Sequence, residues 1–161
     1  MNKKLNVKIV SMNAMIACVY AVLTIICSGI SYGAIQLRFS EILLFLAFYN
    51  RKFIPGLVVG CFLANIPSPL GLADMIFGTF ATVLACLVMY EASKLYIGAI
   101  FGALINGIIV GGELYFVLKL PFLINAFYVF IGEFIVLIIG CIILKYLNNY
   151  SHFMDKYIRN L

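Results

Sequence analysis

The sequence predicts an all-α membrane protein, a bundle of six transmembrane helices. Hydrophobic residues make up 65% of the 161 residues and charged residues only 11%, whereas a soluble domain usually carries about 25% charged residues. The mean hydropathy is +1.14. A transmembrane helix needs roughly 20 apolar residues, so the chain has room for about six spans joined by short loops. We therefore expect a single integral membrane domain over residues 1–161.

Breaks in the apolar runs place the six segments. The expected spans are residues 9–30, 40–49, 53–66, 74–94, 96–118 and 122–147. The second, shorter span ends at the charged residues 51–52, and the third ends at Pro67, because proline lacks an N–H and clashes inside a helix. Lys94 ends the fourth span, and Pro121 marks the turn before the sixth. A short segment, 1–8, precedes the spans and a polar tail, 148–161, follows them.

The Lys and Arg residues predict the orientation. A cytoplasmic N-terminus puts nine of the 11 inside: Lys3, Lys4, Lys8, Arg51, Lys52, Lys94, Lys145, Lys156 and Arg159. Only Arg38 and Lys119 fall outside. Cytoplasmic loops carry an excess of these residues, so we expect both termini in the cytoplasm. The scatter of basic residues at span ends is typical of topology signals and argues against a nucleic-acid partner.

The chain has only six acidic residues, and four of them agree in position. Glu41, Asp74, Glu113 and Glu133 fall at the outer end or in the outer half of expected spans. A carboxylate at the centre of a membrane helix costs about 2.5–3.5 kcal/mol, and less toward the interface. Acids that gather on one side predict a polar pocket there. A ligand with several N–H donors, or with a positive charge, would relieve their excess charge.

Helical spacing supports such a pocket. Asn106 and Glu113 are seven residues apart and share a face of the fifth span, and Asp74, Gly78 and Thr82 form one stripe on the fourth. The candidate substrate-binding residues are Gln36, Arg38, Glu41, Asn65, Asp74, Asn106, Glu113 and Glu133.

Structural roles compete with binding for some of these residues. Asp74 could be a helix N-cap, Glu41 could pair with Arg38 to tie down the loop, and Asn65 could cap the end of its helix. Glu113 is harder to explain in this way, as is Glu133, because isolated acids within spans indicate function by default.

Small residues four apart predict close helix packing. Gly56 and Gly60, and likewise Gly98 and Gly102, suit packing within the bundle. On the first span Ala14, Ala17 and Ala21 are the candidates for an interface with another membrane subunit. The five cysteines lie in apolar runs at no metal-ligand spacing. The sequence also lacks a nucleotide-binding loop, an HExxH motif and a Ser/His/Asp set, so neither an enzyme nor a bound metal or cofactor is expected.

Two segments carry a family resemblance. Residues 36–41, QLRFSE, and residues 56–79, with GLVVGCFLAN, SPLG, Asp74 and FGT, resemble the QueT family, which are substrate-binding (S) components of energy-coupling factor (ECF) transporters. The resemblance implies the six-helix S-component bundle, with an outward-opening site beneath the first loop, in a bacterial cell membrane. It also implies a transmembrane coupling subunit and two cytoplasmic ATPases, which use the ATP. Ala17 and Ala21 match the family's Ala-x-x-x-Ala docking face.

The implied substrate is a queuosine precursor, which is a deazaguanine base such as preQ1 or preQ0, or queuine. The pocket suits it, because a carboxylate accepts two N–H bonds in parallel from a guanine-like edge. We expect Phe77, Tyr115 and Tyr128 to stack on the flat ring. The alternatives are an S component for another vitamin and a small secondary transporter coupled to protons or sodium, with Glu113 and Glu133 as relays.

Overall fold

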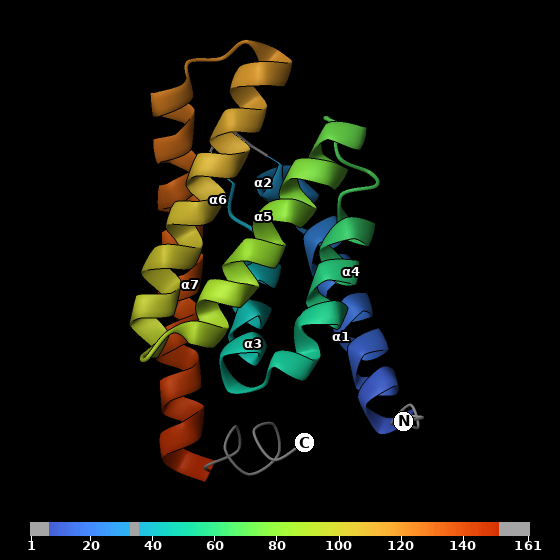
Figure 1. Ribbon diagram of the computed structural model, residues 1–161, viewed down its shortest axis with the longest axis vertical. Helices are drawn as coiled ribbons and strands as arrows, with labels where there is room; N and C mark the ends of the chain where they lie inside the picture. Colours follow the sequence, from blue (N-terminus) through green and yellow to red (C-terminus); the bar gives the residue numbers. More distant parts are fainter. Residues whose placement is uncertain (1–6, 33–35, 152–161) are drawn as a thin grey trace.

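The computed structural model describes residues 7–32 and 36–151, and the side chains as far as residue 147. Within these ranges every regular element is a helix (Figure 1). The elements are α1 (Val7–Ile26), α2 (Ser28–Ser31), η1 (Phe39–Leu44), α3 (Phe45–Tyr49), η2 (Arg51–Phe53), α4 (Ile54–Ala64), α5 (Leu72–Glu91), α6 (Leu95–Leu118) and α7 (Phe122–Ser151). The all-α prediction is therefore confirmed. Residues 1–6 and 152–161, with Lys3, Lys4, Lys156 and Arg159, lie outside the described residues.

Four helices have the length and apolar composition needed to cross a membrane: α1, α5, α6 and α7. The segments expected as the second and third spans are shorter. The second, Phe39–Tyr49, is a 3₁₀-helix that continues into an α-helix. The third, α4, has 11 residues, about half of the roughly 20 that a full crossing needs. Each of the six expected spans contains helix, but six crossings of the membrane stay a prediction.

Sequence signals explain where the short helices begin and end. Pro55 lies in the first turn of α4, where proline costs no hydrogen bond, and Asn65 is the C-cap before Pro67. The next helix, α5, begins after Gly71, whose φ of +58° lies in the left-handed region that favours glycine.

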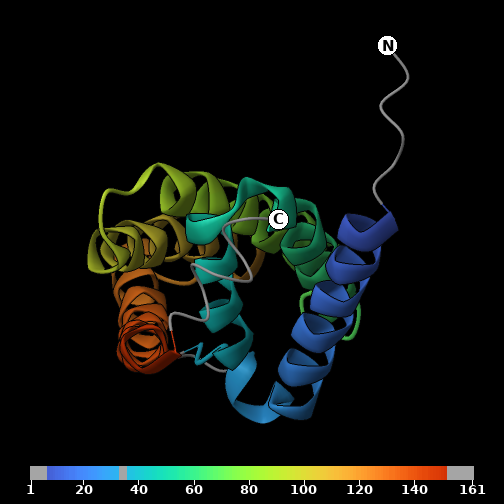
Figure 2. The ribbon, with the colours of Figure 1, turned by 90° about the horizontal axis from the view of Figure 1, so that it is seen from below.

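The four long helices and α4 form a curved row around η1 and α3. Contacts run from α7 to α6, α5, α4 and α1 in that order, and η1 contacts both α1 and α7. Figure 2 shows this row from one end, with α3 lying inside it. Because the segment Phe39–Tyr49 is enclosed on several sides, Leu44, Phe45 and Ala47 are fully buried. The enclosure brings Glu41 of η1 into the interior as well.

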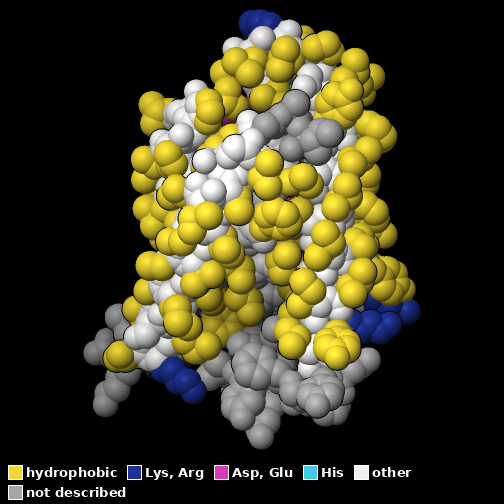
Figure 3. All heavy atoms as spheres, turned by 180° about the vertical axis from the view of Figure 1, so that it is seen from behind, with side chains coloured by type: hydrophobic (Ala, Val, Ile, Leu, Met, Phe, Trp, Pro, Cys, Tyr) yellow, Lys and Arg dark blue, Asp and Glu magenta, His cyan; other side chains and the backbone are white. Residues whose placement is uncertain are grey.

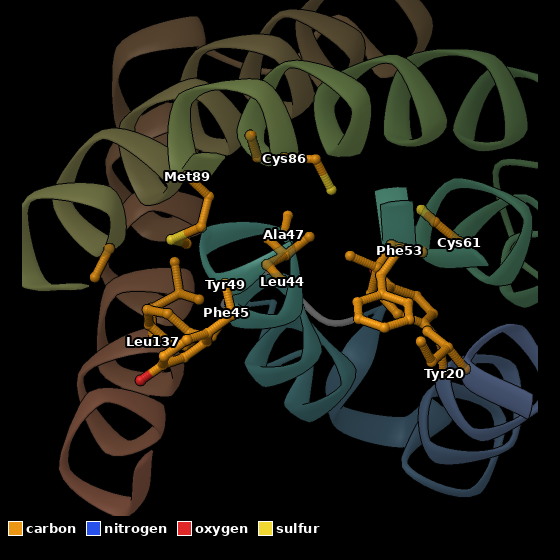
Figure 4. Packing of buried hydrophobic residues seen from close by; sticks show 14 of the residues in the cluster. Tyr20, Leu44, Phe45, Ala47, Tyr49, Phe53, Cys61, Cys86, Met89 and Leu137 are labelled. Carbon is orange, nitrogen blue, oxygen red and sulfur yellow. The ribbon is translucent and has the colours of Figure 1, made fainter. Parts of the chain in front are cut away.

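An apolar core of buried side chains packs around the segment Phe39–Tyr49. Phe45, Phe53, Leu57, Met89 and Leu137 belong to it and are almost completely buried. Figure 4 labels Phe45, Phe53, Met89 and Leu137 together with neighbours from α1, η1, α3, α4 and α5. In lipid, where the tails are as apolar as leucine, helices associate through close packing rather than through exclusion of water. The core therefore stabilises the bundle by the fit of its side chains.

Glycines allow the closest helix crossings. At Gly111 of α6 an added Cβ would lie 2.6 Å from the Cα of Ala126 in α7, and at Gly107 it would lie 2.9 Å from the carbonyl oxygen of Ala126. At Gly60 of α4 a Cβ would lie 2.8 Å from the Cβ of Tyr20 in α1. The expected packing role of Gly60 within the bundle is confirmed.

The alanines expected at a partner interface have different environments. Ala17 and Ala21 are buried against the bundle, and Ala14 is exposed. Ala14 and Ala17 also line a surface groove of about 250 Å³ together with Pro55 and Gly56 of α4. Contact of this groove with another subunit stays a prediction.

The outer surface is apolar around the bundle and charged at its two ends. Figure 3 shows hydrophobic side chains over the length of one face, with Lys and Arg only toward the ends. Residues 51–52 and Lys94 lie in turns at the end where α1 begins (Figure 1). Lys119 lies at the opposite end, in the turn between α6 and α7. This distribution suits a protein surrounded by lipid.

The crossing of α6 and α7 can be tested by adding one methyl group. Gly111→Ala would drive a Cβ into the backbone of α7 and should destabilise the protein by about 1–3 kcal/mol, which lowers the melting temperature in detergent. Gly112→Ala is the matched control, because a Cβ there meets nothing within 4 Å and alanine favours the helix. Equal melting temperatures for the two variants would contradict this packing.

Candidate functional site

A small cavity lies at the end of the bundle that carries Lys119. Its volume is about 270 Å³, near the lower limit of the roughly 300–1,000 Å³ that is typical of small-molecule sites. It is enclosed by the segment after α2, the connection from α4 to α5, and the facing ends of α6 and α7. The lining residues are Tyr32, Gln36, Ser68, Pro69, Leu70, Asp74, Leu114, Leu118, Leu120 and Asn125.

Asp74, which lines this cavity, forms an ion pair with Arg38. Nη2 of Arg38 lies 3.2 Å from Oδ1 and 3.5 Å from Oδ2 of Asp74, and the two side chains are only 3% and 1% exposed. The Ser68 hydroxyl donates to Oδ2 of Asp74, and the Asn65 amide donates to the Asp74 carbonyl oxygen at 3.0 Å. The Arg38 Nε donates to the Ser31 carbonyl oxygen at 3.4 Å. These bonds hold the segment before η1 against α4 and α5.

Two of the structural alternatives are decided by these contacts. The N-cap of α5 is Gly71, and Asp74 lies in the first turn without a capping bond, so the N-cap role for Asp74 is wrong. Asn65 does occupy the C-cap position of α4, and its side chain also reaches Asp74. Gly78 leaves room for this arrangement, because a Cβ there would lie 2.6 Å from Nδ2 of Asn65.

A second polar group, which we call the deep cluster, consists of Glu41, Asn106 and Glu133. The Tyr20 hydroxyl donates to Oε1 of Glu41. The Asn106 side chain interacts with both carboxyl groups, and the two acids interact electrostatically with each other. Three separate elements, η1, α6 and α7, thus bring these residues together, and α1 supplies Tyr20. The structural alternative in which Glu41 pairs with Arg38 is wrong, because Arg38 pairs with Asp74.

Glu113 lies on the buried face of α6. Its side chain is 0% exposed, and it interacts electrostatically with Asp74 and Arg38. The next residue, Leu114, lines the cavity. Neither carboxylate oxygen of Glu113 has a hydrogen-bond partner among the described residues.

The buried side-chain polar atoms without a partner share one property in the part of the chain that the structure describes: all are oxygens. They belong to Ser31, Gln36, Glu41, Asn65, Thr79, Glu113 and Glu133. A buried polar group without a hydrogen bond costs about 1–3 kcal/mol, and more in hydrocarbon. The buried site also holds four carboxyl groups against the one guanidinium of Arg38. Such a site can accept N–H donors or a positive charge.

The eight candidate residues are all buried, and they lie in two adjoining groups. Gln36 and Asp74 line the cavity, and Arg38 and Asn65 bond to Asp74. Glu41, Asn106 and Glu133 form the deep cluster, and Glu113 interacts electrostatically with Asp74 and Arg38. Their role in binding stays a prediction.

The aromatic residues expected to stack on a ligand are elsewhere. Phe77, Tyr115 and Tyr128 are exposed and do not line the cavity, so that expectation is wrong. Tyr32 lines the cavity instead, and its ring lies 5.7 Å from the Arg38 guanidinium carbon.

Sequence reasoning also missed Tyr20 and Ser68 as partners of the acids. A signal for Tyr20 was present, because it lies three residues after Ala17 and seven after Asn13, on the face that packs against α4. Ser68 stands between two prolines, and no pattern in the sequence links it to Asp74.

Comparison with known proteins identifies the family. The family model described as QueT transporter matches residues 10–149. The chain belongs to the QueT family. A curated QueT family relative from Lactococcus lactis subsp. cremoris (strain MG1363), named Queuosine precursor transporter QueT, is 33% identical over 148 residues, which are 81% of this chain and 86% of the relative. No solved structure matches the chain. The family resemblance carried by residues 36–41 and 56–79 is confirmed, and with the apolar helices it identifies a membrane protein.

The ion pair at the cavity gives a stability prediction. Arg38→Met leaves the buried Asp74 carboxylate without its partner, which should cost about 3–5 kcal/mol and lower the melting temperature in detergent. The double variant Arg38→Met with Asp74→Asn removes both charges and should recover part of that loss. Arg51→Met, at an exposed position, is the control. If Arg38→Met and Arg51→Met have the same melting temperature, the ion pair between Arg38 and Asp74 has no structural role.

Proposed function

We propose that this protein is the substrate-binding subunit of an ATP-driven ECF importer and that its ligand is a queuosine precursor, a deazaguanine base. Membership of the QueT family and the name of the Lactococcus lactis relative support a transport role for such a ligand. The observation that carries the proposal is the set of buried oxygens that lack hydrogen-bond donors.

The chemistry of the ligand complements these oxygens. The guanine-like edge of a deazaguanine presents a ring N–H beside an amino group, and a carboxylate accepts two such bonds in parallel. Glu113 is suited to this role because both of its oxygens are buried and unpartnered among the described residues. The Asp74 carboxylate already accepts bonds from Arg38 and Ser68, so Asp74 positions the wall of the cavity.

The proposed topology has six crossings, with both termini in the cytoplasm and the cavity facing outward. The Lys and Arg residues of the turns support it, because residues 51–52 and Lys94 lie at the end opposite the cavity. Excess basic residues mark the cytoplasmic side. The protein would lie in the bacterial cell membrane as one integral domain.

Energy for uptake would come from other subunits. The sequence carries no nucleotide-binding loop, so we assign ATP hydrolysis to two cytoplasmic ATPases and the link to them to a transmembrane coupling subunit. The groove lined by Ala14 and Ala17 between α1 and α4 is the proposed contact with that subunit.

A second candidate function is a secondary transporter. The buried acids Glu113 and Glu133 favour it, because acids within spans also serve as proton or ion relays. Uptake by proteoliposomes separates the two functions. We expect uptake only when the partner subunits and ATP are present. Uptake by the purified protein alone, driven by a proton or sodium gradient, would support the secondary transporter and contradict our proposal.

Ligand class is tested by calorimetric titration of the purified protein. We expect deazaguanine bases to bind at micromolar concentration or below, and riboflavin, thiamine and biotin not to bind. Failure of every deazaguanine at micromolar concentration would refute the proposed substrate.

The role of Glu113 is tested by Glu113→Gln. Hydrogen bonds to a charged group contribute about 1.5–3 kcal/mol, so the affinity for a deazaguanine should fall roughly 10- to 100-fold while the protein stays folded. Glu91→Gln is the control, because Glu91 is exposed at the far end of α5 and should bind as the wild type does. If Glu113→Gln keeps full affinity, Glu113 has a structural role only.

A further inference from the structure

Asn13 of α1 makes three hydrogen bonds, and two of them reach the start of α4. Its Nδ2 donates to the carbonyl oxygens of Ile9 and Lys52, both at 2.9 Å, and its Oδ1 accepts from the Gly56 N–H at 2.6 Å. Lys52 belongs to η2 and Gly56 to α4, so the side chain bonds to both sides of the junction between them. Both N–H donors of the Asn13 amide are in use.

The bond to Gly56 replaces a cap that α4 lacks. The N-cap residue is Phe53, whose apolar side chain cannot accept a hydrogen bond, and Pro55 has no N–H. The first N–H groups of a helix have no partner inside it, so the Gly56 N–H needs an acceptor from elsewhere. Asn13 supplies the acceptor from a separate helix, 43 residues earlier in the chain. The start of α4 is therefore fixed to α1.

Two glycines of α4 bring it close to α1. A Cβ at Gly56 would lie 2.7 Å from both the Oδ1 and the backbone oxygen of Asn13. One turn further along, a Cβ at Gly60 would lie 3.0 Å from the Cα of Ala17. Because α4 has only 11 residues, these two contacts fix its angle to α1. Without the bonds to Asn13, α4 would be free to turn about the contact at Gly60.

The same two helices border the groove that we propose as the contact with the coupling subunit. Its lining residues are spaced three and four apart on one face of each helix, which is how a groove that receives another helix is built. None of the lining residues carries a charge: they are Val10, Asn13, Ala14, Ala17, Pro55, Gly56 and Val59. Since Asn13 uses its amide donors within the protein, the groove matches an apolar helix in the bilayer.

We propose that Asn13 is a positioning residue for docking: by fixing the start of α4 on α1, it sets the width of the groove that receives an apolar helix of the coupling subunit. This inference rests on the proposed function and deepens it. Asn13 bonds to Lys52 at the end of the bundle opposite the ligand cavity. Loss of its side chain should therefore impair assembly and leave ligand binding intact.

The test compares assembly with ligand binding in Asn13→Ala. The coupling subunit and its ATPases are purified together and immobilised, and the affinity of the detergent-solubilised protein for them is measured. Asn13→Ala should bind this complex at least about tenfold more weakly than the wild type, because a displaced α4 loses packing contacts along the groove. Its affinity for a deazaguanine should stay within about twofold of the wild-type value.

A second variant reaches the same contact from α4. Gly56→Ala keeps every hydrogen-bonding group, but its Cβ would push Asn13 away, so it should weaken assembly as Asn13→Ala does. The matched control is Gly111→Ala, which destabilises the crossing of α6 and α7 and does not line the groove. It should melt at a lower temperature and still bind the coupling complex as the wild type does.

Other results would overturn the assignment. If folded Asn13→Ala and Gly56→Ala bind the coupling complex with wild-type affinity, Asn13 has a structural role only. If Gly111→Ala loses assembly to the same extent, or if Asn13→Ala loses deazaguanine affinity as well, general destabilisation explains the effect. If the wild-type protein itself does not bind the complex, the proposed function fails too. Where Asn13→Ala does not fold, Gly56→Ala decides in its place.

Discussion

The structure depends on the burial of charge inside a helix bundle. Arg38 and Asp74 form an ion pair with almost no exposure, and this pair connects the segment before η1, the α4–α5 connection and α5. Removing two charges from water is costly, and only good geometry with further hydrogen bonds compensates for it. Ser68, Asn65 and the Ser31 carbonyl provide those bonds. Glu41 and Glu133 each keep one buried oxygen, and Glu113 keeps both, without a hydrogen-bond partner among the described residues. This difference separates Asp74 from the acids that could still accept bonds from a ligand.

The fold makes this burial possible by enclosing a short segment. Because η1 and α3 lie inside the row formed by α7, α6, α5, α4 and α1, a polar residue of η1 can meet polar residues of α6 and α7 away from lipid. Glycines at the α6–α7 and α1–α4 crossings bring the backbones close enough to seal the row. An apolar core packs around the same short segment.

Many helix ends and buried acids could be predicted from the sequence. The same physical reasons explain which features could not be predicted. Prolines and charges mark the ends of helices, and the cost of a carboxylate in lipid marks Glu113 and Glu133 as buried. Helix rotation could not be predicted as well, because a helix that is apolar all round hides which face meets lipid. For that reason the outward positions of Phe77, Tyr115 and Tyr128 went unrecognised. The length of the second and third segments was also hidden, since an enclosed apolar helix and a lipid-facing one have the same composition. Partners from distant elements, such as Tyr20 for Glu41, depend on the tertiary fold.

The most direct measurement is an experimental structure of the protein with a bound deazaguanine. Our account predicts the base between the segment before η1 and α5, α6 and α7, with its N–H edge within hydrogen-bond distance of Glu113. A ligand bound at the opposite end of the bundle, near Glu91, would contradict the account. So would a complex in which the buried acids still lacked hydrogen-bond donors.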